Sequence, residues 1–370
     1  MKRNQVGGAV FAGLLVLTGC GGDDHNSPSE EESVRVQTTE ALKVAPDEDY
    51  LDSPSGIGRV HKSCAREVPT GAQLDPNGDV FMKGTKIDHI DPCQYPSKPA
   101  KALVNDLEAA NTAPGINGWV EATNQNASTN AYGFNWFNSL QTTLLVEDYP
   151  PLATNDGQEI YIFSSLQASN FASIIQPVLQ WGTTSCGGGG KYWSMADFYV
   201  FCPTTDPNYP SCKTATGAST AHCVHDTAHA VNRGDHIYTE MIVDAIHPGC
   251  SANGKNCNWI MYYDDQTTGA TGAMEVRPPD AYTSAQNLVL EVYNVGRCLA
   301  LPTIGNGVAQ DSVIDAVSTQ LTQPGPSYTS FTPITFNFTG FVTPGLSPSC
   351  GYGVGPGNSA DSELYWSPQD

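Results

Sequence analysis

Two short apolar runs, far apart in the chain, constrain its fold most, because each carries one polar residue among β-forming neighbours. The first is Ile174–Gly182, which reads IIQPVLQWG, and the second is Leu288–Tyr293, which reads LVLEVY. Side chains alternate between the two faces of a strand, so Gln180 and Glu291 each lie opposite a face that can pack on a second sheet. Burying an amide or a carboxylate is costly unless it has partners, so both residues need a structural or chemical reason.

The rest of the chain predicts an all-β fold. From about residue 130 onward, short runs rich in β-branched and aromatic residues alternate with clusters of Gly, Pro, Asn and Asp, which is typical of a sandwich. The predicted strands are 159–166, 174–181, 192–201, 236–243, 258–263, 287–294 and 331–341. We expect a two-sheet antiparallel sandwich over residues 131–370. Residues 56–130 are expected to form an N-terminal extension with a short helix over 98–111.

The two runs resemble the strands that carry the catalytic glutamine and glutamate of the glutamic peptidases, or eqolisins. Gly234–Ile237 resembles a Gly-Asp turn of that family, and Trp259–Gly269 resembles its next hairpin. The resemblance covers residues 158–300. It implies a concanavalin A-like jelly roll, a secreted acid-acting endopeptidase, and catalytic roles for Gln180 and Glu291.

The chemistry of the pair fits that resemblance. An ionised glutamate can take a proton from water and direct the water at a peptide carbonyl. A neutral amide can donate to the developing oxyanion while its oxygen holds the water. The resemblance therefore implies Glu291 as general base, then acid, and Gln180 as the group that positions water and stabilises the oxyanion. Two departures are plain: residues 159–164 lack the family's tryptophan, and residues 202–233 form a long insertion.

Further side chains on predicted strands are candidates for the substrate cleft, and they keep other functions open. The candidates are Trp193, Asp197, Tyr199, Glu240 and Tyr293. Asp197 stands about where the family has a glutamate. A non-catalytic lipoprotein that binds surface carbohydrate or protein is the alternative, with Trp193, Tyr199 and Trp259 as the binding platform. A glycan-cleaving enzyme would need two facing carboxylates, such as Glu291 with Asp197 or Glu240.

The N-terminus predicts export and lipid anchoring. Lys2 and Arg3 precede a short apolar run that ends in Leu-Thr-Gly-Cys20, which is similar to a bacterial lipobox. Residues 1–20 are therefore read as a lipoprotein signal peptide, and Cys20 as the lipidated residue. Residues 21–55 hold ten acids against two bases and predict a disordered tether. The expected location is the bacterial cell envelope, with the lipid as the membrane contact.

The remaining ten cysteines predict disulfides, because an exported chain meets an oxidising compartment. They are Cys64, Cys93, Cys186, Cys202, Cys212, Cys223, Cys250, Cys257, Cys298 and Cys350. Pairing within loops is preferred: Cys64–Cys93, Cys212–Cys223 and Cys250–Cys257. No closely spaced cysteine pair indicates zinc.

Charge and motifs narrow the partners. The net charge of −21, with only 17 Lys and Arg, argues against nucleic acid, whose phosphates need basic contacts. It fits a protein that meets acid, since few bases leave little positive self-repulsion once carboxylates are protonated, and it equally fits adaptation to salt. His222, His225 and His229 have helical metal-site spacing, but Cys223 is expected in a disulfide, so no metal or cofactor is predicted. The expected partner is a protein or peptide substrate, or a surface polysaccharide.

Overall fold

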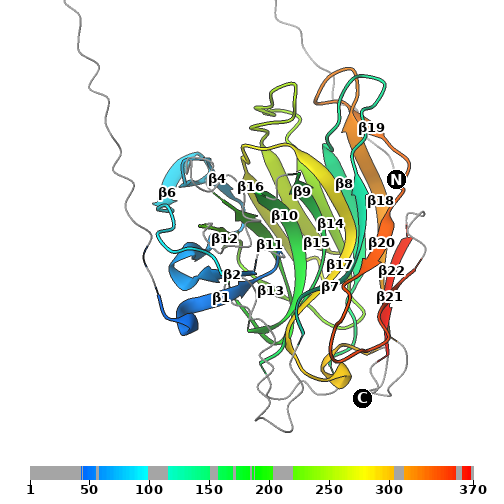
Figure 1. Ribbon diagram of the computed structural model, residues 1–370. Helices are drawn as coiled ribbons and strands as arrows, with labels where there is room; N and C mark the ends of the chain where they lie inside the picture. The colour runs from blue at the N-terminus through cyan, green and yellow to red at the C-terminus, as the bar shows by residue number, and fades with distance from the viewer. Residues whose placement is uncertain are drawn as a thin grey trace, which may run out of the picture. The chain divides into compact units, whose positions relative to one another are not determined.

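The strands of the protein form two large sheets that pack face to face. The computed structural model describes residues 43, 45–55, 58–98, 116–150, 157–169, 172–183, 186, 188–202, 220–303, 312–355 and 361–367. Among these, one sheet has nine strands and the other has eleven (Figure 1). Nearly all strand pairs are antiparallel, so the expected all-β, two-sheet sandwich is confirmed.

The nine-stranded sheet carries both runs that open the sequence argument. In spatial order its strands are β20 (Thr339–Val342), β7 (Ile116–Asn126), β17 (Tyr282–Val295), β9 (Glu159–Ala168), β10 (Ser173–Thr183), β11 (Gly189–Phe201), β12 (His222–His225) and β3 (Ala65–Glu67), with β13 (His229–Ala230) beside β11. The glutamine run is β10 and the glutamate run lies in β17, so β9 alone separates them.

The eleven-stranded sheet covers one face of the first sheet. Its order is β21 (Gly353–Val354), β22 (Asp361–Trp366), β18 (Ser312–Pro324), β8 (Ser139–Leu145), β14 (His236–Val243), β15 (Trp259–Asp265), β16 (Thr271–Val276), β4 (Ala72–Leu74), β5 (Asp79–Met82) and β6 (Thr85–His89), with β19 (Phe331–Pro333) beside β18. The predicted strand 331–341 is thus two strands, β19 and β20, in different sheets.

Alternation along the strands builds the core between the sheets. In β15 every second residue is buried and the residues between are half-buried, because only one face of this strand meets the other sheet. On the opposing sheet, Leu179, Ile162 and Leu290 belong to the same apolar cluster as Ile237 and Tyr263 of the eleven-stranded sheet. The second face of the nine-stranded sheet has its own cluster, described below.

The N-terminal residues differ from the expected tether and extension. β1 (Tyr50–Ser53) and β2 (Gly58–His61) form a hairpin, so the end of the predicted disordered tether is ordered. Its acids have partners that composition does not reveal: Arg59 donates to both carboxyl oxygens of Asp47, at 2.7 and 2.9 Å, and Lys98 also pairs with Asp47. Three short 3-10 turns, η1 (Asp47–Asp49), η2 (Lys62–Cys64) and η3 (Cys298–Ala300), complete the described elements.

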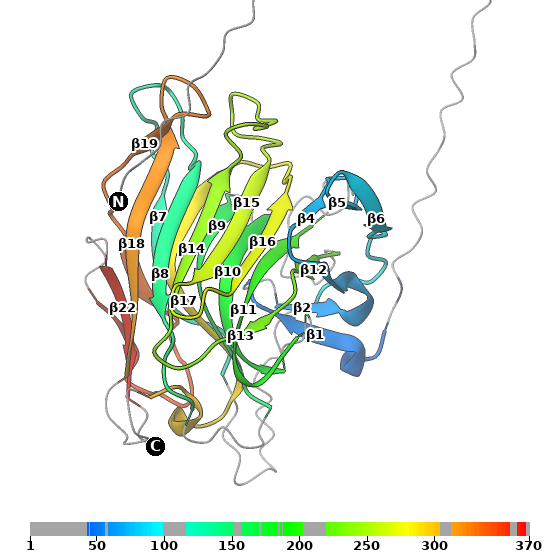
Figure 2. The same cartoon turned by 180° about the vertical axis from the view of Figure 1, so that it is seen from behind.

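The strands that follow the hairpin extend the sandwich. β3 pairs in parallel with β12 in one sheet, and β4 pairs in parallel with β16 in the other. In both views β1, β2, β4 and β6 lie on one side of the sandwich, while β18 and β22 lie on the other (Figures 1 and 2). The predicted N-terminal extension thus contributes strands to both sheets: β3 and β7 to the nine-stranded sheet, and β4, β5 and β6 to the eleven-stranded sheet.

Four disulfides link eight of the described cysteines, and a ninth described cysteine, Cys202, is also disulfide-bonded. The bonds are Cys64–Cys93, Cys186–Cys223, Cys250–Cys257 and Cys298–Cys350. Two of the preferred pairings are thus confirmed. The pairing Cys212–Cys223 is wrong, because β12 places Cys223 beside the loop that holds Cys186.

Some expectations lie outside the described residues. They include the signal peptide with Cys20, most of the helix expected over 98–111, Cys212 and the middle of the insertion. Among the residues that the structure describes, no helix has the length and apolar character needed to cross a bilayer.

Candidate functional site

Gln180 and Glu291 lie on one face of the nine-stranded sheet, in a single row across three strands. Tyr161 of β9 is the register partner of Gln180 on one side and of Glu291 on the other. Residues directly opposite one another in a sheet point to the same face. With a strand spacing of about 4.8 Å, the two Cα atoms are about 10 Å apart. This face points away from the eleven-stranded sheet, since the alternate residues Leu179 and Leu290 lie in the core between the sheets.

The carboxylate of Glu291 is buried and receives an ordered donor. The Tyr293 hydroxyl donates to Glu291 Oε1 at 2.6 Å. Burial and the neighbouring Glu291 raise the pKa of Tyr293 well above its ordinary value, so this hydroxyl keeps its proton and remains a donor. Two residues apart on one strand, the tyrosine and the glutamate share a face, so β17 supplies the acid together with the group that orients it.

A second carboxylate lies close by, and it was missed in the sequence. Glu159 is the register partner of Tyr293, and its Oε2 accepts a 2.9 Å hydrogen bond from the Tyr161 hydroxyl. The rings of Tyr161 and Tyr293 meet edge to face at 6.0 Å. Two glutamates and two tyrosines thus alternate across β9 and β17. The spacing Glu-x-Tyr, repeated as Glu159-x-Tyr161 and Glu291-x-Tyr293, is the signal that could have found the second acid.

Gln180 is held on its other side by β11 and by the loop before it. Its Nε2 donates to the Ser194 hydroxyl at 3.2 Å, while its Oε1 has no hydrogen-bond partner among the described residues. Gly188 passes directly over the amide, and a side chain there would begin 4.0 Å from Gln180 Nε2. The disulfide Cys186–Cys223 fixes this loop to β12. The amide therefore has one fixed donor direction and one oxygen available to a water or a substrate.

The face that carries this row is covered by the N-terminal hairpin. Val60 of β2 packs in the same apolar cluster as Tyr161, Val178 and Tyr293. The Tyr293 hydroxyl lies 3.0 Å from the Ser53 carbonyl oxygen of β1. With the hairpin beside the Glu291–Tyr293 pair and the Gly188 loop over Gln180, both Gln180 and Glu291 are fully buried. The face predicted to be open is closed in this structure, because β1 and β2 lie over it.

Trp119 marks where the row reaches the edge of this cover. It is the register partner of Glu291 on β7, and its ring stacks on Phe341 of the edge strand β20 with centroids 6.2 Å apart. Trp119 is half-buried, and Phe341 is 40% exposed. The register between β7 and β17 shifts between Leu290 and Glu291. Alternation of side chains along either strand does not predict such a shift, so the sequence did not reveal that Trp119 pairs with Glu291.

Most of the other cleft candidates are on the wrong face. Gln180 pairs with Ser194, so Trp193, Asp197 and Tyr199 have the opposite parity and point between the sheets. Glu240 lies in β14 of the other sheet, half-buried, where it accepts a 2.7 Å hydrogen bond from Gln141. The prediction that these four residues line the cleft is therefore wrong. Tyr293, the fifth candidate, does lie beside Glu291.

The proposed aromatic platform is likewise contradicted. Trp193 and Trp259 have no exposed surface, and Tyr199 has almost none. Their rings fill the space between the two sheets, where a sugar cannot stack on them. A carbohydrate site, if the molecule has one, needs different residues.

Asp197 belongs to a buried acid pair instead. The backbone N–H of Asp197 donates to Asp226 Oδ1 at 2.8 Å, and the Thr70 hydroxyl donates to Asp226 Oδ2 at 3.2 Å. Burial raises the pKa of Asp226 to about 7, and burial together with Asp226 raises that of Asp197 well above its ordinary value. Both acids therefore keep their protons below about pH 7, as expected for carboxyl groups buried together between the two sheets.

The histidines of the insertion are engaged in packing. β12 is a strand, so the helical spacing expected for His222, His225 and His229 does not occur. His222 Nε2 accepts from the Cys93 N–H at 3.0 Å, and burial lowers the pKa of His222 to about 4. Within the described ranges, no group of three or more His, Cys, Asp or Glu side chains is placed to hold a metal ion.

Comparisons with known proteins bear on the fold. No protein-family model and no curated protein matches this chain. The solved structures that match include scytalido-glutamic peptidase with a peptide-based transition-state analogue, at 8% identity and a TM-score of 0.38, over 67% of this chain and 98% of that one. SCP-B, a member of the eqolisin family in complex with the tripeptide Ala-Ile-His, matches at 8% identity and 0.38 over the same shares. The chain is similar to these glutamic peptidases at 8–9% identity and TM-scores of 0.38–0.39, over 67–68% of its length.

Proposed function

We propose that this protein is an acid-acting endopeptidase of glutamic-peptidase type, with Gln180 and Glu291 as its catalytic residues. The observation that carries the proposal is the row Gln180–Tyr161–Glu291 on one face of one sheet. The two Cα atoms are about 10 Å apart, two strand spacings, and Tyr161 lies between them on the same face.

The division of labour follows from the hydrogen bonds. Glu291 takes a proton from water with one carboxyl oxygen, while Tyr293 holds Oε1 in place. The Gln180 amide donates to the oxyanion that forms on the carbonyl, and its Oε1, which has no hydrogen-bond partner among the described residues, accepts from the attacking water. Glu291 then passes the proton to the leaving amine, which completes cleavage without a metal or cofactor in the scheme.

Substrate can reach this row only if the hairpin β1–β2 leaves the face. Among the described residues, the two strands pair with each other and with no strand of either large sheet, and Arg59 of β2 also forms a backbone bridge with Lys98. Displacing them therefore breaks no ladder of the sandwich, and an isolated two-stranded hairpin is only marginally stable in water. We propose that the hairpin is the movable part of the cleft.

A second candidate function is glycan hydrolysis, because Glu159 gives this face a second carboxylate. Glu159 lies diagonally across from Glu291 on the neighbouring strand, with Cα atoms about 7–8 Å apart, and a glycosidase needs two carboxylates near one glycosidic bond. The peptidase proposal takes precedence because Gln180 has no role in a two-carboxylate mechanism, although it lies in the same row.

Export and anchoring complete the proposal. We propose that the chain is held in the cell envelope by a lipid on Cys20, which the lipobox-like sequence before it supports. Mass spectrometry of the mature N-terminus would find a diacylglyceryl group on Cys20; an intact unmodified N-terminus in the cytoplasm would contradict this.

The test is cleavage of a denatured protein by the full-length chain, from strongly acidic to neutral pH. Wild type should cleave in acid, and Glu291→Gln should lower turnover by about 10²–10⁴-fold, the usual contribution of general acid–base catalysis. Glu159→Gln should retain most activity. Loss of polysaccharide cleavage in both glutamate variants, with no proteolysis by wild type, would replace this proposal by the glycan hydrolase.

A matched pair of valine variants tests the hairpin. Val60→Ala removes packing between the hairpin and the face, while Val80→Ala removes an equally buried valine from β5 on the eleven-stranded sheet. Val60→Ala should raise the initial cleavage rate severalfold, whereas Val80→Ala should leave it unchanged. Equal rates in the two variants would show that hairpin displacement does not limit access.

A further inference from the structure

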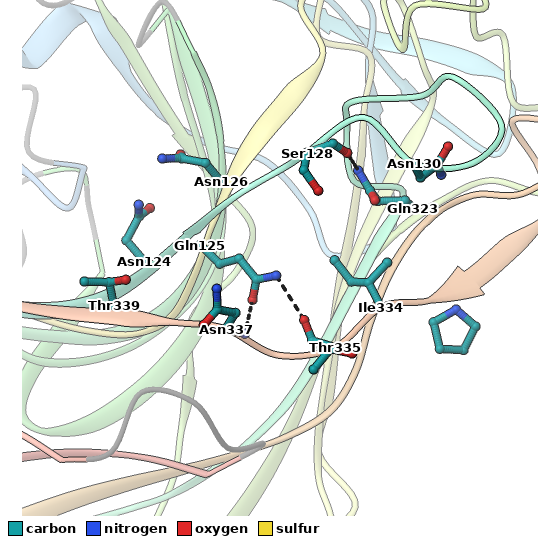
Figure 3. A pocket seen from close by; sticks show the side chains of 11 residues that line it. Asn124, Gln125, Asn126, Ser128, Asn130, Gln323, Ile334, Thr335, Asn337 and Thr339 are labelled. Atoms are coloured by element: carbon teal, nitrogen blue, oxygen red, sulfur yellow. Dashed lines mark hydrogen bonds between the residues drawn. The ribbon is translucent and has the colours of Figure 1, made fainter.

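A large polar cavity lies at one end of the sandwich, away from the glutamine–glutamate row. Its volume is about 860 Å³, and it is formed where the end of β7, the following loop, the end of β18 and the segment between β19 and β20 meet (Figure 3). The lining residues are Asn124, Gln125, Asn126, Ser128, Asn130, Gln323, Pro333, Ile334, Thr335, Asn337 and Thr339. Both sheets contribute to this wall, so the cavity is part of the architecture.

The lining carries no charged side chain, in a molecule with a net charge of −21. It consists of six amides and three hydroxyls, with two apolar residues beside them. An amide offers two donors and an acceptor, and a hydroxyl offers both functions. A surface of this kind has no counter-ion for a charged ligand, and its donors and acceptors match a ligand whose own groups both donate and accept.

Several of these amides are fixed by the backbone. Gln125 donates to the Thr335 carbonyl oxygen at 3.1 Å and accepts from the Asn337 N–H at 2.7 Å (Figure 3). Gln323 Nε2 donates to the Ser128 carbonyl oxygen at 2.8 Å. Asn130 donates to a carbonyl of β18 and accepts from two N–H groups of its own loop. The cavity wall is therefore ordered before any ligand arrives, which reduces the entropy cost of binding.

Other lining side chains remain available. Asn126, Asn337 and Thr339 are exposed, and within the described residues their side chains make no hydrogen bond (Figure 3). Tyr132, on the loop that supplies Ser128 and Asn130, is 52% exposed. Fixed amides thus shape the cavity, free amides and a hydroxyl face into it, and an amphipathic ring stands on a loop that borders it.

We propose that this cavity binds a neutral oligosaccharide. Sugar hydroxyls donate and accept at once, as the amides of the lining do, and an uncharged chain needs no ion pair. A peptide fits less well, because the cavity offers only Pro333 and Ile334 to apolar side chains and no charge to charged ones. The site is separate from the row of Gln180 and Glu291 and does not depend on the function proposed for it.

The test is titration of the full-length protein with neutral hexasaccharides of glucose and of N-acetylglucosamine, followed by NMR of the side-chain amides. A hexamer of galacturonic acid and a neutral decapeptide serve as competing ligand classes. At least one neutral hexasaccharide should shift the side-chain signals of Asn126 and Asn337, and the galacturonate should bind more weakly.

Variants assign the binding to the cavity. The double variant Asn126→Ala/Asn337→Ala should weaken binding by about tenfold or more, since it removes two amide groups available for hydrogen bonds. Gln266→Ala, an exposed amide at the β15–β16 turn, should bind as wild type does, and so should Glu291→Gln. Thermal unfolding followed by circular dichroism verifies that each variant is folded.

Three results would overturn the proposal. One is the absence of shifts with every neutral saccharide up to about 10 mM, a concentration above any useful affinity. Another is unchanged affinity in the folded double variant. The third is binding of the decapeptide at Asn126 and Asn337 with none of the saccharides, which would identify a peptide site instead.

Discussion

The two faces of the nine-stranded sheet bury their acids in different ways. Glu291 lies on the face away from the second sheet, where Tyr293 donates to it. Glu121, whose register partner is Leu290, points between the sheets, where burial raises its pKa to about 9 and only the Gly353 backbone opposes this. Burial alone therefore does not distinguish Glu291, which we propose as the catalytic acid, from Glu121. The distinguishing feature is an ordered set of polar neighbours, including a second functional group such as Gln180.

Apart from the loss expected for Glu291→Gln, the largest expected effect separates two glutamines of β10 that share a face. Gln176 and Gln180 are both fully buried, but only Gln180 lies in the row with Glu291. Gln180→Ala should lower turnover by about 10²–10³-fold, as loss of an oxyanion donor does. Gln176→Ala should leave turnover unchanged in the same assay. Equal losses in the two variants would mean that packing on this face, and not the amide of Gln180, supports activity.

The next effect is the pH dependence that Glu121 gives to the free energy of unfolding. Its pKa is raised from 4.5 to about 9 on folding, so the folded state holds a proton that the unfolded state releases, and stability falls as pH rises from about 4.5 to 9. At pH 7 the loss is about 3 kcal/mol. In urea unfolding, Glu121→Gln should flatten this decline between pH 5 and 8. An unchanged slope would show that Glu121 ionises freely in the folded protein.

A smaller effect is expected at the acid pair between the sheets. Asp226 should titrate near pH 7 in the folded protein, as followed by its carboxyl carbon NMR signal. Thr70→Val removes a hydrogen bond to the charged carboxylate, so the pKa of Asp226 should rise by about half a unit to one unit. A pKa of Asp226 near its ordinary value in wild type would contradict the burial described for this pair.

The smallest effect is local. Tyr293→Phe removes the hydroxyl that lies between Glu291 and the Ser53 carbonyl. The one hydroxyl proton is shared between Glu291 and the Ser53 carbonyl, and a full hydrogen bond contributes about 1 kcal/mol, so amide hydrogen exchange in β1 and β2 should accelerate by at most about fivefold. Exchange in β14, on the far sheet, is the internal control. Equal protection of the hairpin in both proteins would mean that this contact does not hold it.

Sequence reasoning succeeded where one strand decides the answer. Alternation along β10 and β17 places Gln180 and Glu291 opposite the core residues Leu179 and Leu290, and this is where they lie. It failed for Trp193, Asp197 and Tyr199 because alternation groups residues within β11 without giving their register against β10. That register, Gln180 with Ser194, depends on the connection between the strands.

Local sequence patterns did not predict that the hairpin β1–β2 covers the face of Gln180 and Glu291. The acidic residues 47–52 read as a tether, since nothing nearby in the sequence announces that Arg59 and Lys98 neutralise Asp47. The disulfide Cys186–Cys223 likewise joins two loops that only the folded sheet brings together. Contacts between residues far apart in the chain depend on the whole fold. The composition of a single segment does not predict them.

The most direct test compares the acids of the two faces in one assay. Full-length wild type, Glu291→Gln and Glu121→Gln are incubated with a denatured protein at acidic pH, and the released peptides are quantified. We expect Glu291→Gln to lose about 10²–10⁴-fold of turnover and Glu121→Gln to cleave as wild type does. Cleavage by Glu291→Gln at the wild-type rate would contradict the assignment of Glu291 as the catalytic acid–base group.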